Sequence, residues 1–88
     1  MVDSSKPIQF SGHAIQQLQF RGATEAEVIE AIRTAPWQPA DNGRMECRKD
    51  HAFNATWNRR HYAMKQVRPI FVVEPNEIVV VTVYVYYF

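Results

Sequence analysis

The C-terminal stretch IVVVTVYVYY, residues 78–87, decides the fold. Its β-branched and aromatic residues favour a β-strand. Because successive side chains of a strand point to opposite faces of the sheet, the valines at the odd positions form one row. The hydroxyl-bearing Thr82, Tyr84 and Tyr86 form the other row. We expect the valine row to lie under helices and the hydroxyl row to form an open binding face.

Three further strands are predicted before this segment. The longest covers residues 62–73 and makes a hairpin with residues 78–87, while shorter strands cover residues 44–49 and 53–57. All three show the period-two alternation or the β-branched and aromatic content of strands. The loop at residues 74–77 contains a Pro-Asn pair, which is typical of a turn. These strands predict an antiparallel sheet.

The centre of the hairpin loop sets which residues share a face. If the loop turns at its Pro-Asn pair, Val73 lies opposite Ile78 and Lys65 lies opposite Tyr86. Lys65 then shares the hydroxyl face, and Arg68 falls on the valine face near its edge. A change of one residue in the loop length exchanges the two faces.

Two helices are predicted in the N-terminal half. Ser11 as the N-cap and Gly22 as the C-terminal glycine bound the first helix. Thr24 and Glu27 form a capping box for the second helix, which ends near Ala35, ahead of a proline. The predicted fold is therefore α+β, with two N-terminal helices packed on one face of a four-stranded antiparallel sheet in the order ααββββ. A loose arm at residues 1–7 precedes a single domain at residues 8–88.

Composition excludes several classes of protein. Apolar residues make up 47% and charged residues 22% of the 88 residues, which is typical of a folded domain rather than a disordered chain. The single cysteine, Cys47, excludes an internal disulfide and any multi-cysteine metal site, so we expect neither a metal nor another cofactor. The chain shows neither a secretory signal nor an apolar run long enough to span a membrane, so we expect a cytoplasmic protein without a membrane partner.

Charge is unevenly distributed along the chain. Residues 44–68 hold seven Lys and Arg against two acidic residues, although the whole chain carries a net charge of only +1. This region can attract an anionic partner such as RNA, or it can be a solvated sheet face studded with cations. We assign Arg48, Lys65, Arg68 and Tyr84 as candidate RNA contacts, because cations bind phosphates and a tyrosine ring stacks on an unpaired base.

Short motifs along most of the chain carry a resemblance to a known group of proteins. In order they are Ser-Gly-His-Ala at 11–14, Arg-Gly at 21–22, Thr-Glu-Ala-Glu-Val at 24–28, Gly-Arg at 43–44 and Val-Thr-Val-Tyr at 81–84. This pattern resembles a widespread bacterial family of small domains of unknown function, which is similar to the BrnT and RelE type ribonuclease toxins. The resemblance covers roughly residues 9–85. It implies a metal-independent site that cleaves or binds RNA, drawing on His13, Arg21 and Thr82.

Each of these three residues also has a structural interpretation. Histidine suits proton transfer and arginine suits phosphate binding, so His13 and Arg21 on one helix and Thr82 on the last strand would make a catalytic pocket. Alternatively, His13 covers the helix end and packs on the strands, and Arg21 bonds the last carbonyls of its own helix. Thr82 and Tyr84 are also compatible with an ordinary polar sheet face.

A second hypothesis is a non-enzymatic interaction module. The aromatic C-terminal strand would be an exposed edge that pairs with a partner or with a second copy, giving a homodimer. Toxins of the type that the sequence resembles are held by an antitoxin protein, and this apolar end would suit such a contact. The sequence leaves both hypotheses open.

Overall fold

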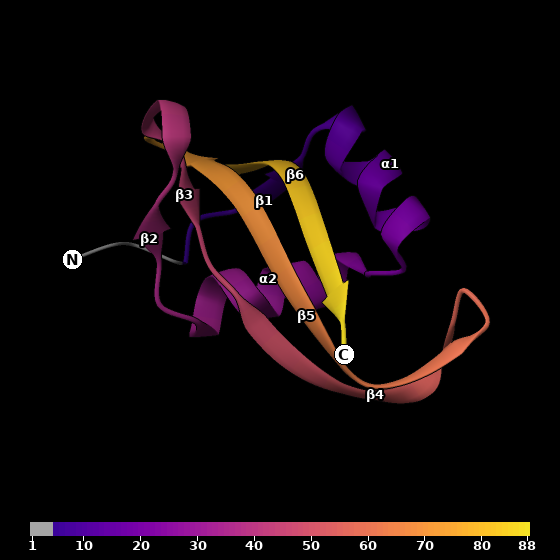
Figure 1. Cartoon of the computed structure of the whole chain (residues 1–88). Helices are drawn as coiled ribbons and strands as arrows, with labels where there is room; N and C mark the ends of the chain where they lie inside the picture. The colour runs from indigo at the N-terminus through magenta and orange to yellow at the C-terminus, as the bar shows by residue number, and fades with distance from the viewer. Residues whose placement is uncertain (1–4) are drawn as a thin grey trace.

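The computed structural model describes residues 5–88 as a six-stranded sheet with two helices (Figure 1). The elements are β1 (Ile8–Phe10), α1 (Gly12–Arg21), α2 (Glu25–Thr34), β2 (Gln38–Pro39), the 3-10 turn η1 (Asp41–Gly43), β3 (Met45–Glu46), β4 (Lys49–Trp57), β5 (Arg60–Val73) and β6 (Ile78–Tyr87). The strand order is β1-β6-β5-β3-β2, and β4 also pairs with β5. The predicted α+β class is confirmed.

The predicted four-stranded antiparallel sheet is wrong in strand number and in direction. The sheet has six strands and is mixed, because β1 runs parallel to β6, with Ile8 opposite Ile78. The two strands that were not predicted, β1 and β2, are three and two residues long. Segments this short are defined by their hydrogen-bonding partners, since they contain too few residues to show a period of two.

The predicted strand at residues 44–49 is interrupted opposite Pro69. Residue Glu46 of β3 pairs with Ile70, and Lys49 of β4 pairs with Val67, so the ladder skips the position of Pro69 between them. Proline has no N–H to donate to a neighbouring strand. The break between β3 and β4 therefore lies where β5 cannot offer a complete ladder bond, and the buried Cys47 lies in that break.

A β-bulge in β6 corrects the predicted valine row. Val73 pairs with Ile78, as predicted, but the register then shifts, since Phe71 pairs with Val80 while Ile70 pairs with Thr82. Val81 is the extra residue. As a result, the face of β6 that packs against the helices carries Ile78 and Val80 before the bulge, then Val83, Val85 and Tyr87 after it. The expectation that all odd-numbered valines lie under the helices is wrong for the residues that precede the bulge.

Both helices begin and end as their capping residues predict. The Ser11 hydroxyl accepts a hydrogen bond from the Ala14 amide, and Gly22 ends α1 in the left-handed conformation at φ 75°. Thr24 and Glu27 form both hydrogen bonds of the capping box, and α2 ends at Thr34 with Ala35 as its C-cap.

The helices pack on one face of the sheet and form the core with it. Ala14 and Leu18 of α1 are buried over β6, and α2 buries its apolar stripe over β5. Phe71 is fully buried at the centre of this layer, and the Trp37 ring packs edge-on against it at 4.9 Å between centroids. Aromatic side chains bury the largest areas, so this pair anchors the core.

Most of the outer edge of β6 has no strand beside it. Among the described residues, β1 covers β6 only at residues 78–80. Farther along, two side chains from the ends of α1 take the place of a partner strand. Ser11 Oγ donates to the Val81 carbonyl at 3.2 Å, and Arg21 Nη1 donates to the Val83 carbonyl at 2.7 Å. These contacts occupy backbone carbonyls of the exposed edge and hinder its pairing with another strand. A strand from a second chain could pair along this part of β6 only if Arg21 moved.

The first four residues of the predicted arm lie outside the described part of the chain. Of the remaining three, Pro7 accepts a hydrogen bond from the Ile78 amide, and the Lys6 ammonium donates to the Glu74 carbonyl. These bonds tie the start of β1 to the β5–β6 hairpin. No helix in residues 5–88 is long and apolar enough to span a membrane.

Replacing Gly22 with alanine should strongly destabilise the fold. A Cβ atom there would lie 2.6 Å from both the Trp57 ring and the Tyr87 hydroxyl, in a left-handed conformation that alanine disfavours. We expect Gly22→Ala to lower the free energy of unfolding by about 2–4 kcal/mol, measured by urea denaturation.

Gly12→Ala is the matched control for that measurement. Nothing lies within 4 Å of a Cβ atom at Gly12, which is the first residue of α1, and alanine favours a helix. Its stability should equal or slightly exceed that of the parent protein. Equal losses for both variants would contradict the assigned contact of Gly22 with Trp57 and Tyr87.

Candidate functional site

A pocket of about 390 Å³ lies on the face of the sheet opposite the helices. Side chains there alternate along β5 and β6 with those of the core. The loop from β2 to β3 forms the other wall. The lining residues are Pro39, Ala40, Asp41, Asn42, Arg44, Glu46, Arg68, Ile70, Thr82 and Tyr84. We call it the open-face pocket, and it contains Thr82, Arg68 and Tyr84 of the residues predicted from sequence.

Arg68 is the most highly connected side chain of the pocket. Its Nε and Nη2 atoms both lie 2.5 Å from Glu46 Oε2, and its Nη1 donates to the Tyr86 hydroxyl at 3.2 Å. The hydrogen bond to Tyr86 and the ion pair with Glu46 outweigh burial and raise the pKa of Arg68 above its ordinary value. The guanidinium therefore stays charged and held in one orientation on the open face.

Two guanidinium groups meet at the ring of Tyr84. The guanidinium carbon of Arg21 lies 4.9 Å from the ring centroid, and that of Arg68 lies 5.3 Å from it. Arg21 extends from the last turn of α1 and bonds the Val83 carbonyl at the β6 edge. The structure thus brings Arg21, Arg68 and Tyr84 together beside Thr82, although these residues come from three different elements.

His13 is not part of this group. It is exposed in the first turn of α1, does not line the pocket, and its side chain makes no hydrogen bond or ion pair within residues 5–88. Arg21 follows eight positions later in the helix, which is about 12 Å along the axis. Of the predicted catalytic trio, Thr82 lines the pocket and Arg21 lies at its rim, while His13 lies outside it. A catalytic role for His13 stays a prediction.

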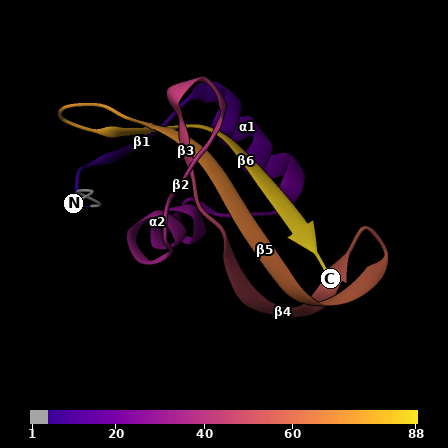
Figure 2. The ribbon, with the colours of Figure 1, turned by 60° about the vertical axis from the view of Figure 1, so that its left-hand side comes forward.

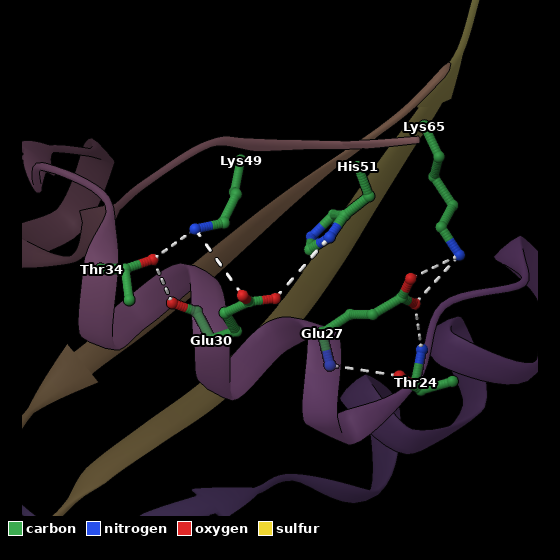
Figure 3. Close-up of polar contacts among 7 residues, drawn as sticks. All are labelled: Thr24, Glu27, Glu30, Thr34, Lys49, His51 and Lys65. Carbon is green, nitrogen blue, oxygen red and sulfur yellow. Dashed lines mark hydrogen bonds and ion pairs between the residues drawn. The ribbon is translucent and has the colours of Figure 1, made fainter. Parts of the chain in front are cut away.

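The predicted faces of Lys65 and Arg68 are exchanged. Lys65 was expected opposite Tyr86 on the open face, but the bulge at Val81 moves its partner to Tyr87 on the helix face. Its ammonium is buried, lies 2.8 Å from a carboxylate oxygen of Glu27 and donates to the Gly22 carbonyl at 3.1 Å (Figure 3). Lys65 is thus not available to bind RNA, and the reason is the single extra residue in β6.

Arg48, the remaining predicted contact, lies outside the open-face pocket. It is exposed in the break between β3 and β4 and borders a smaller hollow of about 170 Å³ beside Cys47. Burial, with the nearby Glu46 charge, raises the pKa of Cys47 to about 12, so its thiol is not activated as a nucleophile.

Sequence reasoning missed three charged residues of the pocket. Asp41, Arg44 and Glu46 come from the loop and strand that fold over β5. The alternation of charges along residues 44–48 was visible in the sequence, but the contact of Glu46 with Arg68 depends on the pairing of β3 with β5. With Arg68, the lining carries two cations and two carboxylates, and Arg21 adds a cation at the rim.

A second polar cluster joins α2 to the sheet on the helix face (Figure 3). Glu30 lies 3.8 Å from the Lys49 ammonium and 3.7 Å from His51 Nδ1, and Glu27 binds Lys65. Burial raises the pKa of Glu27, but the hydrogen bonds from Lys65 and the Thr24 amide and the charges of Lys65 and His51 outweigh it, so the net pKa is lowered. Among residues 5–88 no cluster of metal-ligating side chains occurs.

Comparisons with protein-family models, curated proteins and solved structures found no match for this chain. The resemblance to BrnT and RelE type toxins therefore stays a prediction from the sequence motifs.

The Glu27–Lys65 pair should make stability fall in acid. Because the folded-state pKa of Glu27 is lowered, its contribution is present above the unfolded pKa and is lost as pH falls through the folded pKa. Glutamine at position 27 can still form a capping box but carries no charge. We therefore expect the free energy of unfolding of Glu27→Gln to fall less than that of the parent protein between neutral pH and about pH 3.

Urea denaturation of both proteins across this pH range measures the effect. Glu25→Gln is the control, since this exposed carboxylate lies in the same first turn of α2 and no ion pair joins it to other described residues. The assignment is contradicted if Glu27→Gln loses as much stability in acid as the parent protein does.

Proposed function

We propose that the open-face pocket binds single-stranded RNA. The observation that carries this proposal is the convergence of Arg21 and Arg68 on the ring of Tyr84, beside Thr82. A planar guanidinium binds two phosphate oxygens at once, and a tyrosine ring stacks on a base. RNA offers both groups in one ligand.

The pocket favours an unpaired strand over a duplex. A base must be unstacked before it can lie on an aromatic side chain, and bases in loops and single strands meet this condition. The hydroxyls of Thr82 and Tyr86 are both donors and acceptors, so they suit the 2′-hydroxyl of a ribose. The lining alone carries no net charge, so the attraction for phosphate depends on Arg21 at the rim.

Metal-independent RNA cleavage is the second candidate function, and Glu46 is the observation that favours it. Cleavage by the 2′-hydroxyl needs a base near that group and cations around the phosphorane. Glu46 is a carboxylate with 12% of its side chain exposed, and it lies in the pocket against Arg68. In this proposal the carboxylate accepts the 2′-hydroxyl proton and the 2′-oxygen bonds to phosphorus. The bond from phosphorus to the 5′-oxygen then breaks, the leaving oxygen takes a proton from water, and the guanidinium groups stabilise the charge of the phosphorane.

Removing the charge of Arg68 should weaken RNA binding. Arg68→Gln keeps a donor for Glu46 but loses the cation and the planar fork, and we expect the Kd for a labelled oligouridine to rise about tenfold at low salt. Fluorescence anisotropy measures the Kd, and urea denaturation confirms that the variant is folded.

The variant Arg48→Gln tests whether RNA binds in the pocket or is attracted to the basic surface in general. Since Arg48 lies outside the pocket, its loss should leave the Kd nearly unchanged. Equal losses for Arg48→Gln and Arg68→Gln would indicate diffuse electrostatic attraction. Absence of any salt-dependent binding by the parent protein would refute the proposed function.

Cleavage is tested with two single variants of the same protein. If Glu46 is the base, Glu46→Gln retains RNA binding and loses cleavage, while His13→Ala cleaves like the parent protein. The opposite result would assign the proton transfer to His13, as the sequence motifs predict. Cleavage should persist in the presence of a chelator, because the proposed reaction uses no metal ion.

A further inference from the structure

The turn between β4 and β5 holds an arginine in a conformation that favours glycine. Asn58 and Arg59 form a two-residue turn with φ 51° and φ 69°, and Trp57 pairs with Arg60 across it. Positive φ at both central residues is the pattern of a type I′ turn, for which Asn-Gly is the preferred sequence. Asparagine fits its position, whereas Arg59 is strained, and strain of this kind points to a role outside folding.

The strained arginine belongs to a cationic tip. Arg59, Arg60 and His61 are all exposed, and the sequence holds no acidic residue between Asp50 and Glu74. Within residues 5–88 neither Arg59 nor Arg60 makes an ion pair, and the Arg60 guanidinium lies 5.9 Å from the Tyr62 ring centroid. The guanidinium groups of Arg59 and Arg60 are therefore available to bind an anionic partner.

Aromatic packing holds the hairpin close to its turn, because Trp57 directly precedes Asn58. The Trp57 ring stacks on Tyr87 with 5.1 Å between centroids and an interplanar angle of 17°, and Phe53 and Tyr62 also pack against Tyr87. The paired strands continue past the end of β6 and curve, with the turn at their far end (Figures 1 and 2). The contacts of Trp57 thereby anchor the turn to the end of β6 and to Gly22.

We propose that this tip, residues 58–61, binds the phosphate backbone of the nucleic acid strand whose bases enter the open-face pocket. The proposal rests on the proposed function, because it assigns a second contact to the same ligand. Unpaired arginines suit phosphates, and backbone contacts position a strand without reading its sequence. The exposed large apolar residues include none from the tip, so the tip has nothing to insert into a lipid surface.

The test compares the binding of a short RNA with the binding of a long one. A uridine trinucleotide should occupy the pocket alone, whereas an oligouridine of about 20 nucleotides should also reach the tip, since single-strand sites commonly extend over many nucleotides. The parent protein should therefore bind the long strand more tightly and with a steeper dependence on salt.

Arg59→Gly is the decisive variant, because it should stabilise the fold and weaken binding together. Glycine relieves the strain, so we expect the Tm to rise by roughly 4 °C. The Kd for the long strand should rise about threefold to tenfold, and its salt slope should fall by about 0.7, as for one lost phosphate contact. The Kd for the trinucleotide should not change.

Two further variants serve as controls. Arg59→Lys keeps the charge and should retain most of the affinity for the long strand without the gain in Tm. Arg33→Gln removes one exposed cation from the end of α2, away from the tip, and should leave both Kd values unchanged.

The outcomes distinguish failure of the tip from failure of the pocket. Unchanged binding of the long strand by Arg59→Gly overturns the role of the tip, even if the trinucleotide still binds. If the parent protein binds neither RNA, the proposed function fails as well. Arg59-dependent binding to vesicles of anionic phospholipid, with no such dependence for RNA, would also overturn the assignment.

Discussion

The β-bulge at Val81 is the constraint on which the rest of the structure depends. Before the bulge, Ile78 and Val80 pack under the helices, and after it Val83 and Val85 do so. The same shift places Tyr87 on the helix face, opposite Lys65, and leaves Arg68 and Tyr84 on the open face. One extra residue thus assigns Lys65 to the fold and Arg68 to the candidate binding site.

The C-terminal end of α1 joins three parts of the molecule. Arg21 bonds the edge of β6 and reaches the ring of Tyr84, while its own carbonyl accepts a hydrogen bond from the Tyr87 hydroxyl at 2.5 Å. Gly22 allows Trp57 of the hairpin to pack directly against the chain. The position of the guanidinium in the candidate site therefore depends on packing between the helix, the sheet edge and the hairpin.

Some of the cations of this protein are neutralised by ion pairs and others are not. The helix face pairs the carboxylates of α2 with Lys49 and Lys65, so these lysines contribute little to an external field. Arg68 is likewise paired with Glu46, whereas Arg21 beside Tyr84 and the arginines of the hairpin tip make no ion pair within residues 5–88. The net charge of +1 does not show this difference, because it counts every charge in the same way, whether or not that charge lies in an ion pair.

The sequence alone determined the local structure. The capping residues Ser11 and Thr24 and the glycine at position 22 fixed the helix bounds, and β-branched residues fixed the two long strands, because these signals act over a few neighbouring residues. Tertiary structure decided the short strands, the bulge and the meeting of Glu46 with Arg68. These depend on partners distant in sequence, and a one-residue shift in pairing reverses the faces without any change in local preference.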